Sequence, residues 1–264
     1  MQRELKIGIA GVGVVGSAVN AGFAKRGIVP TLYDAPKALG TIEALAGCDV
    51  VFLCLPTTFS GDEFDKSAIR AVLGELSGFG GLVVVKSTVE PGTCEAYAQQ
   101  YGVNVAFNPE FLTARTALED FDAQSHIVCG RTSTCPELLF QRLVRMYNDG
   151  WPTARLSVCS ATEAESMKLF VNTFYAVKVQ VFNEFYALCM SQGTDFAVIR
   201  DLMLGNGWIH PMHTRVPGPD GMLGFGGACL PKDSRACLHL MKRRSTPCAV
   251  IEATVAENPQ RKPE

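Results

Sequence analysis

The sequence lacks a surplus of basic residues, a long apolar run and an apolar leader. Lysine and arginine number 24 against 26 aspartate and glutamate residues in a chain of 264, a formal net charge of −2. Without a basic surplus, no broad surface is available to neutralise a phosphate backbone, which argues against nucleic acid as the main partner. No stretch of about 18 apolar residues is present, and no apolar leader precedes the first strand-like residues. We therefore expect a chain that neither binds nucleic acid nor enters a membrane.

The ten cysteines lack the close spacing of a metal knuckle. Most lie inside apolar runs such as VVFLCLP and HIVCG, and no two form a C-x-x-C pair. Without a leader, this distribution predicts reduced thiols in the cytoplasm, most of them packed as small hydrophobic side chains. His210 and His213 form an H-x-x-H pair, but no third ligand follows nearby, so we expect no bound metal.

The first part of the chain contains short, continuous apolar runs separated by helical stretches. A composition of 47% hydrophobic and 19% charged residues is globular. Continuous rather than alternating apolar runs indicate a parallel sheet covered on both faces. The predicted strands are Leu5–Ala10, Ile28–Tyr33, Asp49–Leu55, Gly81–Lys86, Val103–Phe107 and His126–Gly130. The pattern predicts an α/β fold, a doubly wound sheet within a first domain of residues 1–155.

A long uninterrupted helix is expected after residue 155. Ser160 and Glu163 have the S-x-x-E spacing of a capping box, and neither glycine nor proline occurs before Gly193. A helix over 162–192 would be about 45 Å long at 1.5 Å per residue. Such a helix exposes more apolar surface than a small helical domain covers, so we predict a homodimer through this region. Residues 156–264 are thus expected to form an all-α domain.

A glycine-rich loop follows the first predicted strand and opens a helix. Gly11-Val12-Gly13-Val14-Val15-Gly16 matches G-x-G-x-x-G, and Asp34 ends the second strand 18 positions after Gly16. In this context the glycines permit a tight turn, close approach to a pyrophosphate and helix–strand packing. A carboxylate at Asp34 would bind a ribose diol and repel a 2′-phosphate, which favours NAD over NADP. The loop therefore predicts a Rossmann-type NAD-binding domain; FAD and a glycine turn without ligand are the alternatives.

Two further segments carry residues suited to catalysis. Lys168 and Asn172 lie four positions apart, on one face of the long helix. Cys229 lies in the glycine-rich stretch 224–233, and Asp233 follows it by four residues. A lysine cation near a thiol favours the nucleophilic thiolate. The alternatives are a lysine that extends to solvent and a tight loop with a buried thiol.

These segments together resemble the UDP-glucose/GDP-mannose dehydrogenase family, the nucleotide-sugar 6-dehydrogenases. The matching blocks are Gly11–Gly16, Leu55–Thr57, Lys86–Thr93, Asn108–Leu112, Lys168–Asn172 and Gly224–Asp233. They occur in the family's order over residues 5 to about 257. The chain has Ala114 where the family usually has an acidic residue, and a longer link over 208–221. Only 35 residues follow Cys229, too few for the family's C-terminal UDP-binding domain, so we expect that domain to be missing.

The resemblance implies a four-electron oxidation of a sugar primary alcohol to a carboxylate, with NAD as cofactor and a nucleotide sugar such as UDP-glucose as substrate. Cys229 would be the nucleophile that forms a thiohemiacetal and then a thioester. Glu110 would activate the hydrolytic water, Thr88 would position it, and Asp233 would help to orient it. Lys168 and Asn172 would stabilise the oxyanion.

The resemblance also implies binding residues. The predicted cofactor residues are Gly11, Val12, Gly13, Val14, Val15, Gly16, Asp34, Leu55, Pro56, Thr57, Ser87 and Thr88. The predicted substrate residues are Glu110, Phe111, Leu112, Lys168, Asn172, Arg215, Phe225, Gly226 and Cys229. Two other functions remain open at this point: a two-electron dehydrogenase of the β-hydroxyacid type, and a non-catalytic protein that binds NAD or a nucleotide sugar.

Overall fold

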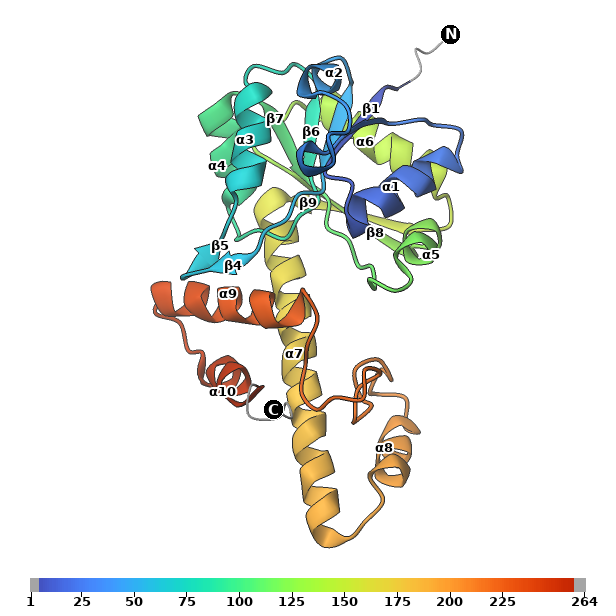
Figure 1. Ribbon diagram of the computed structural model, residues 1–264, viewed down its shortest axis with the longest axis vertical. Coiled ribbons are helices and arrows are strands. Elements are labelled where there is room, and N and C mark those ends of the chain that lie inside the picture. Colours follow the sequence, from blue (N-terminus) through green and yellow to red (C-terminus); the bar gives the residue numbers. More distant parts are fainter. Residues whose placement is uncertain (1–4, 259–264) are drawn as a thin grey trace. The chain divides into compact units, whose positions relative to one another are not determined.

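The computed structural model describes residues 5–258 and contains two compact units (Figure 1). The first unit holds the residues up to 60 together with 64–168. The second holds 61–63 together with the residues from 169 onward.

The first unit is built on a seven-stranded sheet in the order β2-β1-β3-β6-β7-β8-β9. Its strands are β1 (Ile7–Ala10), β2 (Thr31–Tyr33), β3 (Val50–Leu53), β6 (Leu82–Val85), β7 (Asn104–Phe107), β8 (His126–Arg131) and β9 (Arg155–Ser160). All neighbours pair in parallel except β7 and β8, which are antiparallel. The predicted doubly wound sheet is confirmed, with one reversed junction near its edge.

Helices cover both faces of this sheet. Figure 1 shows α3 and α4 on one face and α1 and α5 on the other. The helices of the unit are α1 (Val14–Ala24), α2 (Ile42–Ala46), α3 (Ser67–Glu75), α4 (Thr93–Tyr101), α5 (Ala117–Asp122) and α6 (Glu137–Gly150), with a 3₁₀ turn η1 (Ala35–Lys37). Along β3, Val51 and Leu53 enter one hydrophobic core whereas Val50 and Phe52 enter the other. Since side chains alternate across a strand, two covered faces require an apolar residue at every position.

Strand β9 was not among the predicted strands. Its six residues are all intermediate or exposed, and Val158 is 54% exposed. A strand at the edge of a sheet with one open face does not need a continuous apolar run, so the pattern that revealed the buried strands is missing. Strand β2 is also shorter than the predicted Ile28–Tyr33.

The second unit is helical apart from its share of a small two-stranded sheet, β4 (Phe59–Ser60) with β5 (Glu63–Phe64). Its helices are α7 (Ala161–Gln192, from residue 169 on), α8 (Phe196–Leu204), α9 (Leu230–Arg243) and α10 (Ala249–Glu257). The predicted long helix is confirmed, and its first turn is capped as expected. The Ser160 backbone N–H donates to Glu163 Oε2 over 2.8 Å, and the Glu163 N–H donates to Ser160 Oγ over 3.2 Å.

Within residues 5–258, no helix combines the length and apolar character needed to cross a bilayer. No disulfide joins any of the ten cysteines, all of which lie in the described part of the chain. Six of them are buried, three are intermediate and Cys229 is exposed. The expectation that most thiols pack inside the protein is confirmed.

Candidate functional site

The glycine-rich loop lies between β1 and α1, and its three glycines have different surroundings. Gly11 has φ +86°, and a Cβ there would lie 2.5 Å from the Cys54 carbonyl oxygen. A Cβ at Gly16 would lie 1.9 Å from the Gly11 carbonyl oxygen. A Cβ at Gly13 would meet nothing within 4 Å. The fold itself therefore requires Gly11 and Gly16, whereas Gly13 faces open space that the chain does not fill.

The N-terminus of α1 is open to an anion. Gly13 is its N-cap, so no side chain caps the helix, and no acidic residue occupies the first turn. Val14, in that turn, is 54% exposed. Uncapped N–H groups and the positive end of the helix dipole suit a phosphate group. The open side of Gly13 and this helix end fit the pyrophosphate of a dinucleotide.

Asp34 lies at the end of β2, where it is tied to the same loop. Its Oδ2 accepts the Val12 N–H over 2.7 Å, and its Oδ1 accepts the Lys37 N–H over 3.1 Å. The Lys37 ammonium donates to the Val12 carbonyl oxygen over 2.5 Å. An ionised carboxylate offers about four acceptor positions, so Asp34 retains capacity for a ribose hydroxyl.

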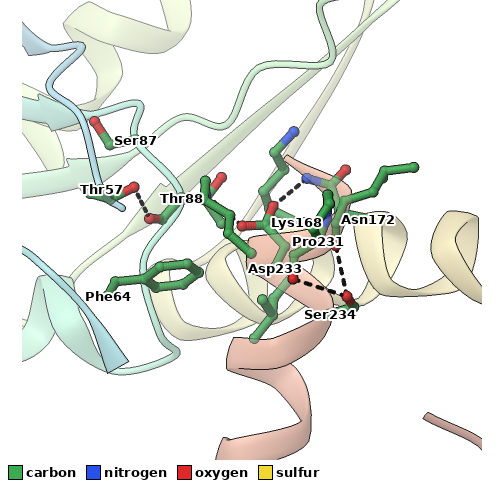
Figure 2. Close-up of polar contacts among 12 residues, drawn as sticks. Thr57, Phe64, Ser87, Thr88, Lys168, Asn172, Pro231, Asp233 and Ser234 are labelled. Atoms are coloured by element: carbon green, nitrogen blue, oxygen red, sulfur yellow. Dashed lines mark hydrogen bonds and ion pairs between the residues drawn. The ribbon is translucent and has the colours of Figure 1, made fainter. Parts of the chain in front are cut away.

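The other predicted cofactor residues join the carboxyl ends of neighbouring strands β3 and β6. Thr57 Oγ1 donates to the Thr88 carbonyl oxygen over 2.8 Å, as Figure 2 shows. Ser87 Oγ donates to the Leu55 carbonyl oxygen over 2.6 Å. Thr57 and Thr88 are buried, and Pro56 is exposed. These bonds place the two segments side by side at the edge where open α/β sheets bind ligands.

Glu110, which is partly buried, and Lys168, which is buried, form an ion pair in the first unit. Lys168 Nζ lies 3.2 Å from Glu110 Oε1 and donates to the Glu110 carbonyl oxygen over 2.6 Å. Glu110 Oε2 accepts the Leu112 N–H over 2.7 Å. The Lys168 side chain is 4% exposed, so this lysine does not extend to solvent. The pair holds a carboxylate and an ammonium in fixed positions.

Sequence reasoning missed the network that supports this pair. Lys86 Nζ donates to Asn108 Oδ1 over 2.6 Å, the Tyr147 hydroxyl donates to the same oxygen, and Asn108 Nδ2 donates to the Val128 carbonyl oxygen over 2.7 Å. Burial lowers the pKa of Lys86. Asn108 lies two residues before Glu110, so the network anchors the turn that carries the carboxylate. Lys86 and Asn108 lie in the matching blocks, but Tyr147, in α6, has no sequence signal.

In the second unit, Asp233 is fully buried in the first turn of α9. Its Oδ2 accepts from Asn172 Nδ2 over 2.5 Å, and its Oδ1 lies 2.5 Å from Lys232 Nζ. Figure 2 shows Asp233 beside Asn172. Cys229 is exposed and is the N-cap residue of α9. Lys232 lies within the matching block 224–233 but is not among the predicted site residues.

The remaining predicted substrate residues differ in exposure. Phe111 is 42% exposed and stacks on His126 with ring centroids 6.4 Å apart. Arg215 is exposed, and Phe225 is buried beside the half-exposed Gly226. Among residues 5–258 no group of three potential metal ligands comes together.

A mostly parallel sheet covered by helices, together with this glycine loop, defines a dinucleotide-binding α/β protein. Residues 37–149 match the NAD binding domain of the UDP-glucose/GDP-mannose dehydrogenase family, and residues 162–260 match its central domain. The chain belongs to this family, which confirms the resemblance read from the motifs. The matched domain also supports NAD as the cofactor.

Several curated relatives are similar over most of this chain. UDP-glucose 6-dehydrogenase of Rickettsia bellii is 32% identical over 83% of the chain and 51% of its own length. That of Rickettsia prowazekii is 34% identical over 67% of the chain and 40% of its own length. UDP-N-acetyl-D-mannosamine dehydrogenase of Pyrococcus horikoshii is 34% identical over 75% of the chain and 47% of its own length. The chain thus spans about half the length of these relatives.

Solved structures show the same architecture. A UDP-glucose dehydrogenase from Pyrobaculum islandicum aligns over 98% of this chain and 68% of its own, with a TM-score of 0.82 and 27% identity. The UDP-D-ManNAc dehydrogenase of Pyrococcus horikoshii aligns over 97% of this chain and 68% of its own, with a TM-score of 0.80 and 22% identity.

Proposed function

We propose that the chain carries the NAD-binding and catalytic parts of a nucleotide-sugar dehydrogenase that oxidises a sugar primary alcohol to a carboxylate. In this proposal residues 1–155 form the cofactor domain and residues 156–264 the catalytic domain. The substrate is UDP-glucose or a related sugar nucleotide. NAD, when bound, supplies a hydride acceptor, and two NAD molecules are used in turn, one in each oxidation.

The observation that carries the proposal is the position of Cys229. It is exposed, it follows a glycine-rich loop, and it is the N-cap residue of the 14-residue helix α9. The positive end of a helix dipole favours an anion, which suits a cysteine that reacts as its thiolate. A simple alcohol dehydrogenase has no use for such a nucleophile, whereas a four-electron oxidation does.

The first oxidation converts the alcohol to an aldehyde, with loss of a hydride from carbon and a proton from oxygen. The Cys229 sulfur then bonds to the aldehyde carbon, and the resulting oxyanion takes up a proton as a thiohemiacetal. Loss of a second hydride from that carbon and of the hydroxyl proton leaves a thioester. Water adds to the thioester carbonyl, the carbon–sulfur bond breaks, and the carboxylate and the Cys229 thiol are released.

The charged residues have roles that suit this sequence of steps. Glu110 would take the proton of the attacking water, and Thr88 would hold that water. Lys168 and the second N–H of Asn172 Nδ2 would donate to the oxyanion. Asp233 would hold the Asn172 amide in place through the bond that joins them over 2.5 Å.

The remaining predicted residues would bind the ligands. The cofactor would contact the glycine loop, Asp34, Leu55–Thr57 and Ser87–Thr88. Phe111, Leu112, Arg215, Phe225 and Gly226 would contact the nucleotide sugar, with Arg215 offering a guanidinium to a phosphate.

The stoichiometry of NADH tests the proposal. The chain is incubated with NAD and UDP-glucose, UDP-N-acetyl sugars, GDP-mannose or free sugar phosphates, and NADH is counted per substrate consumed. We expect two NADH per carboxylate formed with one of the sugar nucleotides. One NADH per product would indicate a two-electron dehydrogenase, and tight NAD binding without NADH formation would indicate a binding protein.

Substitution of the thiol separates the two oxidations. In Cys229→Ala the rate of aldehyde oxidation should fall by a factor of about 10³ or more, because covalent catalysis is removed. Cys248→Ala, a change at a half-buried thiol outside the proposed site, is the matched control. Full turnover to carboxylate by Cys229→Ala would contradict the proposed mechanism.

We further propose that two copies associate through an exposed stripe on α7 and that the protein is cytoplasmic. Phe170, Phe174, Val181, Phe185 and Leu188 are 37–62% exposed and follow one another at intervals of four, seven, four and three residues. This spacing places them on one helix face that suits packing against another helix. The reduced, mostly buried thiols suit a reducing compartment.

A further inference from the structure

Two buried asparagines hold the loop that leads into Cys229. The Gly224 N–H donates to Asn183 Oδ1 over 2.9 Å. The Phe225 N–H donates to Asn258 Oδ1 over 2.8 Å, and Asn258 Nδ2 donates back to the Phe225 carbonyl oxygen over 3.0 Å. Asn183 is 3% exposed and Asn258 is 7% exposed. Consecutive residues of the loop are therefore bound from α7 and from the end of α10.

The contact between Asn258 and Phe225 has a specific chemical requirement. One planar side chain must present an acceptor to an N–H and a donor to the carbonyl of the same residue. A carboxamide of this size carries both groups at any pH, whereas an ionised carboxylate carries acceptors only. Because both partners are buried, loss of either bond leaves an unsatisfied backbone group.

The segment between this contact and the thiol lies in neither a helix nor a strand. Gly226, Gly227 and Ala228 separate Phe225 from Cys229, and Gly227 has φ +77°. Beyond Cys229, α9 begins, and the Asp233 N–H donates to the Cys229 carbonyl oxygen over 2.9 Å. The backbone at Cys229 is thus held on its C-terminal side by helix α9. On its N-terminal side it is held by the contact of the Asn258 amide with Phe225, four residues before Cys229.

We propose that Asn258 is a positioning residue for Cys229: its amide orders the glycine-rich loop so that the thiol meets the aldehyde carbon. The inference rests on the proposed role of Cys229 as nucleophile. Asn258 itself touches neither substrate nor cofactor in this proposal. A small displacement of a reacting group is costly, so the effect should fall on the steps that use the thiol.

The test compares the two oxidations in Asn258→Asp. Ionised aspartate keeps an acceptor for the Phe225 N–H but has no donor for the Phe225 carbonyl oxygen, so both oxidations are assayed at neutral pH and above. The probes are UDP-glucose and its 6-aldehyde, or the equivalent pair for the sugar selected by the stoichiometry experiment. We expect kcat for aldehyde oxidation to fall by about tenfold or more, because a displaced thiol raises the barrier of the steps that use it. The conversion of alcohol to aldehyde should change by less than about twofold, because it does not use the thiol.

Two control variants isolate the lost donor. Asn183→Asp also buries a new carboxylate, but it keeps the acceptor that Gly224 uses, since Asn183 Nδ2 bonds to Val179 of its own helix. It should slow aldehyde oxidation less than Asn258→Asp does. Asn148→Asp, at an exposed position on α6, should leave both rates unchanged.

A structural role alone would lower both oxidations equally, and that result would overturn the proposal. So would equal effects of Asn183→Asp and Asn258→Asp on aldehyde oxidation. Should Asn258→Asp not fold, Asn258→Gln keeps both hydrogen-bonding groups on a side chain one methylene longer and introduces no charge. It should again slow only aldehyde oxidation, and equal slowing of both steps would reject the inference. Cys229→Ala tests the nucleophile separately, so a failure of either idea can be distinguished.

Discussion

At the scale of single residues, the three glycines of the first loop divide into two that the fold requires and one that faces open space. Gly11 and Gly16 lie where a Cβ would meet backbone at 2.5 and 1.9 Å, whereas Gly13 has open space around its missing side chain. A motif that looks uniform in sequence thus contains positions with different physical demands.

This difference predicts opposite results for two alanine substitutions. Gly13→Ala should fold with its thermal midpoint nearly unchanged but lose NAD affinity by about tenfold or more, because the methyl group occupies the approach to the pyrophosphate. Gly16→Ala should destabilise the protein by about 2 kcal/mol or more, because the backbone must move to accept the Cβ. Calorimetric titration with NAD and thermal unfolding measure the two effects. Wild-type NAD affinity in Gly13→Ala would contradict the proposed binding site.

At the scale of elements, Glu165 joins the start of α7 to the start of α4. Its Oε2 accepts the Gly92 N–H over 2.6 Å, and its Oε1 accepts the Cys94 N–H over 2.8 Å. Glu165 is fully buried, and burial raises its pKa to about 7. The pKa of the Cys94 thiol is also raised, mainly by burial and to a smaller extent by the nearby Glu165 charge.

The raised pKa of Glu165 predicts a pH-dependent stability. Between its ordinary pKa and about 7, the carboxyl is protonated in the folded protein and ionised in the unfolded chain. Folding takes up a proton in this window. The contribution of Glu165 to the free energy of unfolding is therefore fully present below about pH 4.5 and is lost as the pH rises through 7. The free energy of unfolding should fall by about 3 kcal/mol from this group alone.

Denaturant unfolding at several pH values measures that change. Glu165→Gln, which does not titrate, should show a shallower decline across pH 4.5–7.5 than the wild type. Glu163→Gln is the matched control, because Glu163 is exposed and its pKa is lowered by the Ser160 hydrogen bonds. Parallel curves for the wild type and Glu165→Gln would show that Glu165 does not titrate in this window.

At the scale of the whole molecule, the apolar stripe of α7 predicts self-association. Leu188→Glu, at a position 54% exposed, would place a charge within the proposed interface and should shift the mass from about twice 28.5 kDa to the monomer value. Leu138→Glu, at a position 65% exposed on α6, is the control and should leave the dimer intact. Light scattering at micromolar concentration measures the mass. A monomeric wild-type chain would rule out the proposed dimer.

The sequence alone determined the features that depend on local pattern. The buried strands could be predicted because two covered faces demand continuous apolar residues. The start of α7 could be predicted because Ser160 and Glu163 lie three residues apart in the chain. The family itself followed from short blocks in a fixed order, and so did the candidate residues Glu110, Lys168 and Cys229.

Only the tertiary structure decided which distant residues meet. The antiparallel junction of β7 with β8 depends on how strands pair, and neither strand carries a signal for its direction. Asn108 meets Tyr147 across 39 residues, and Asn258 meets Phe225 across 33. A carboxamide satisfies a backbone group wherever the fold brings the two together, so no spacing in the sequence reveals the contact. The chemical groups are therefore readable in the sequence, whereas the contacts that orient them depend on the fold.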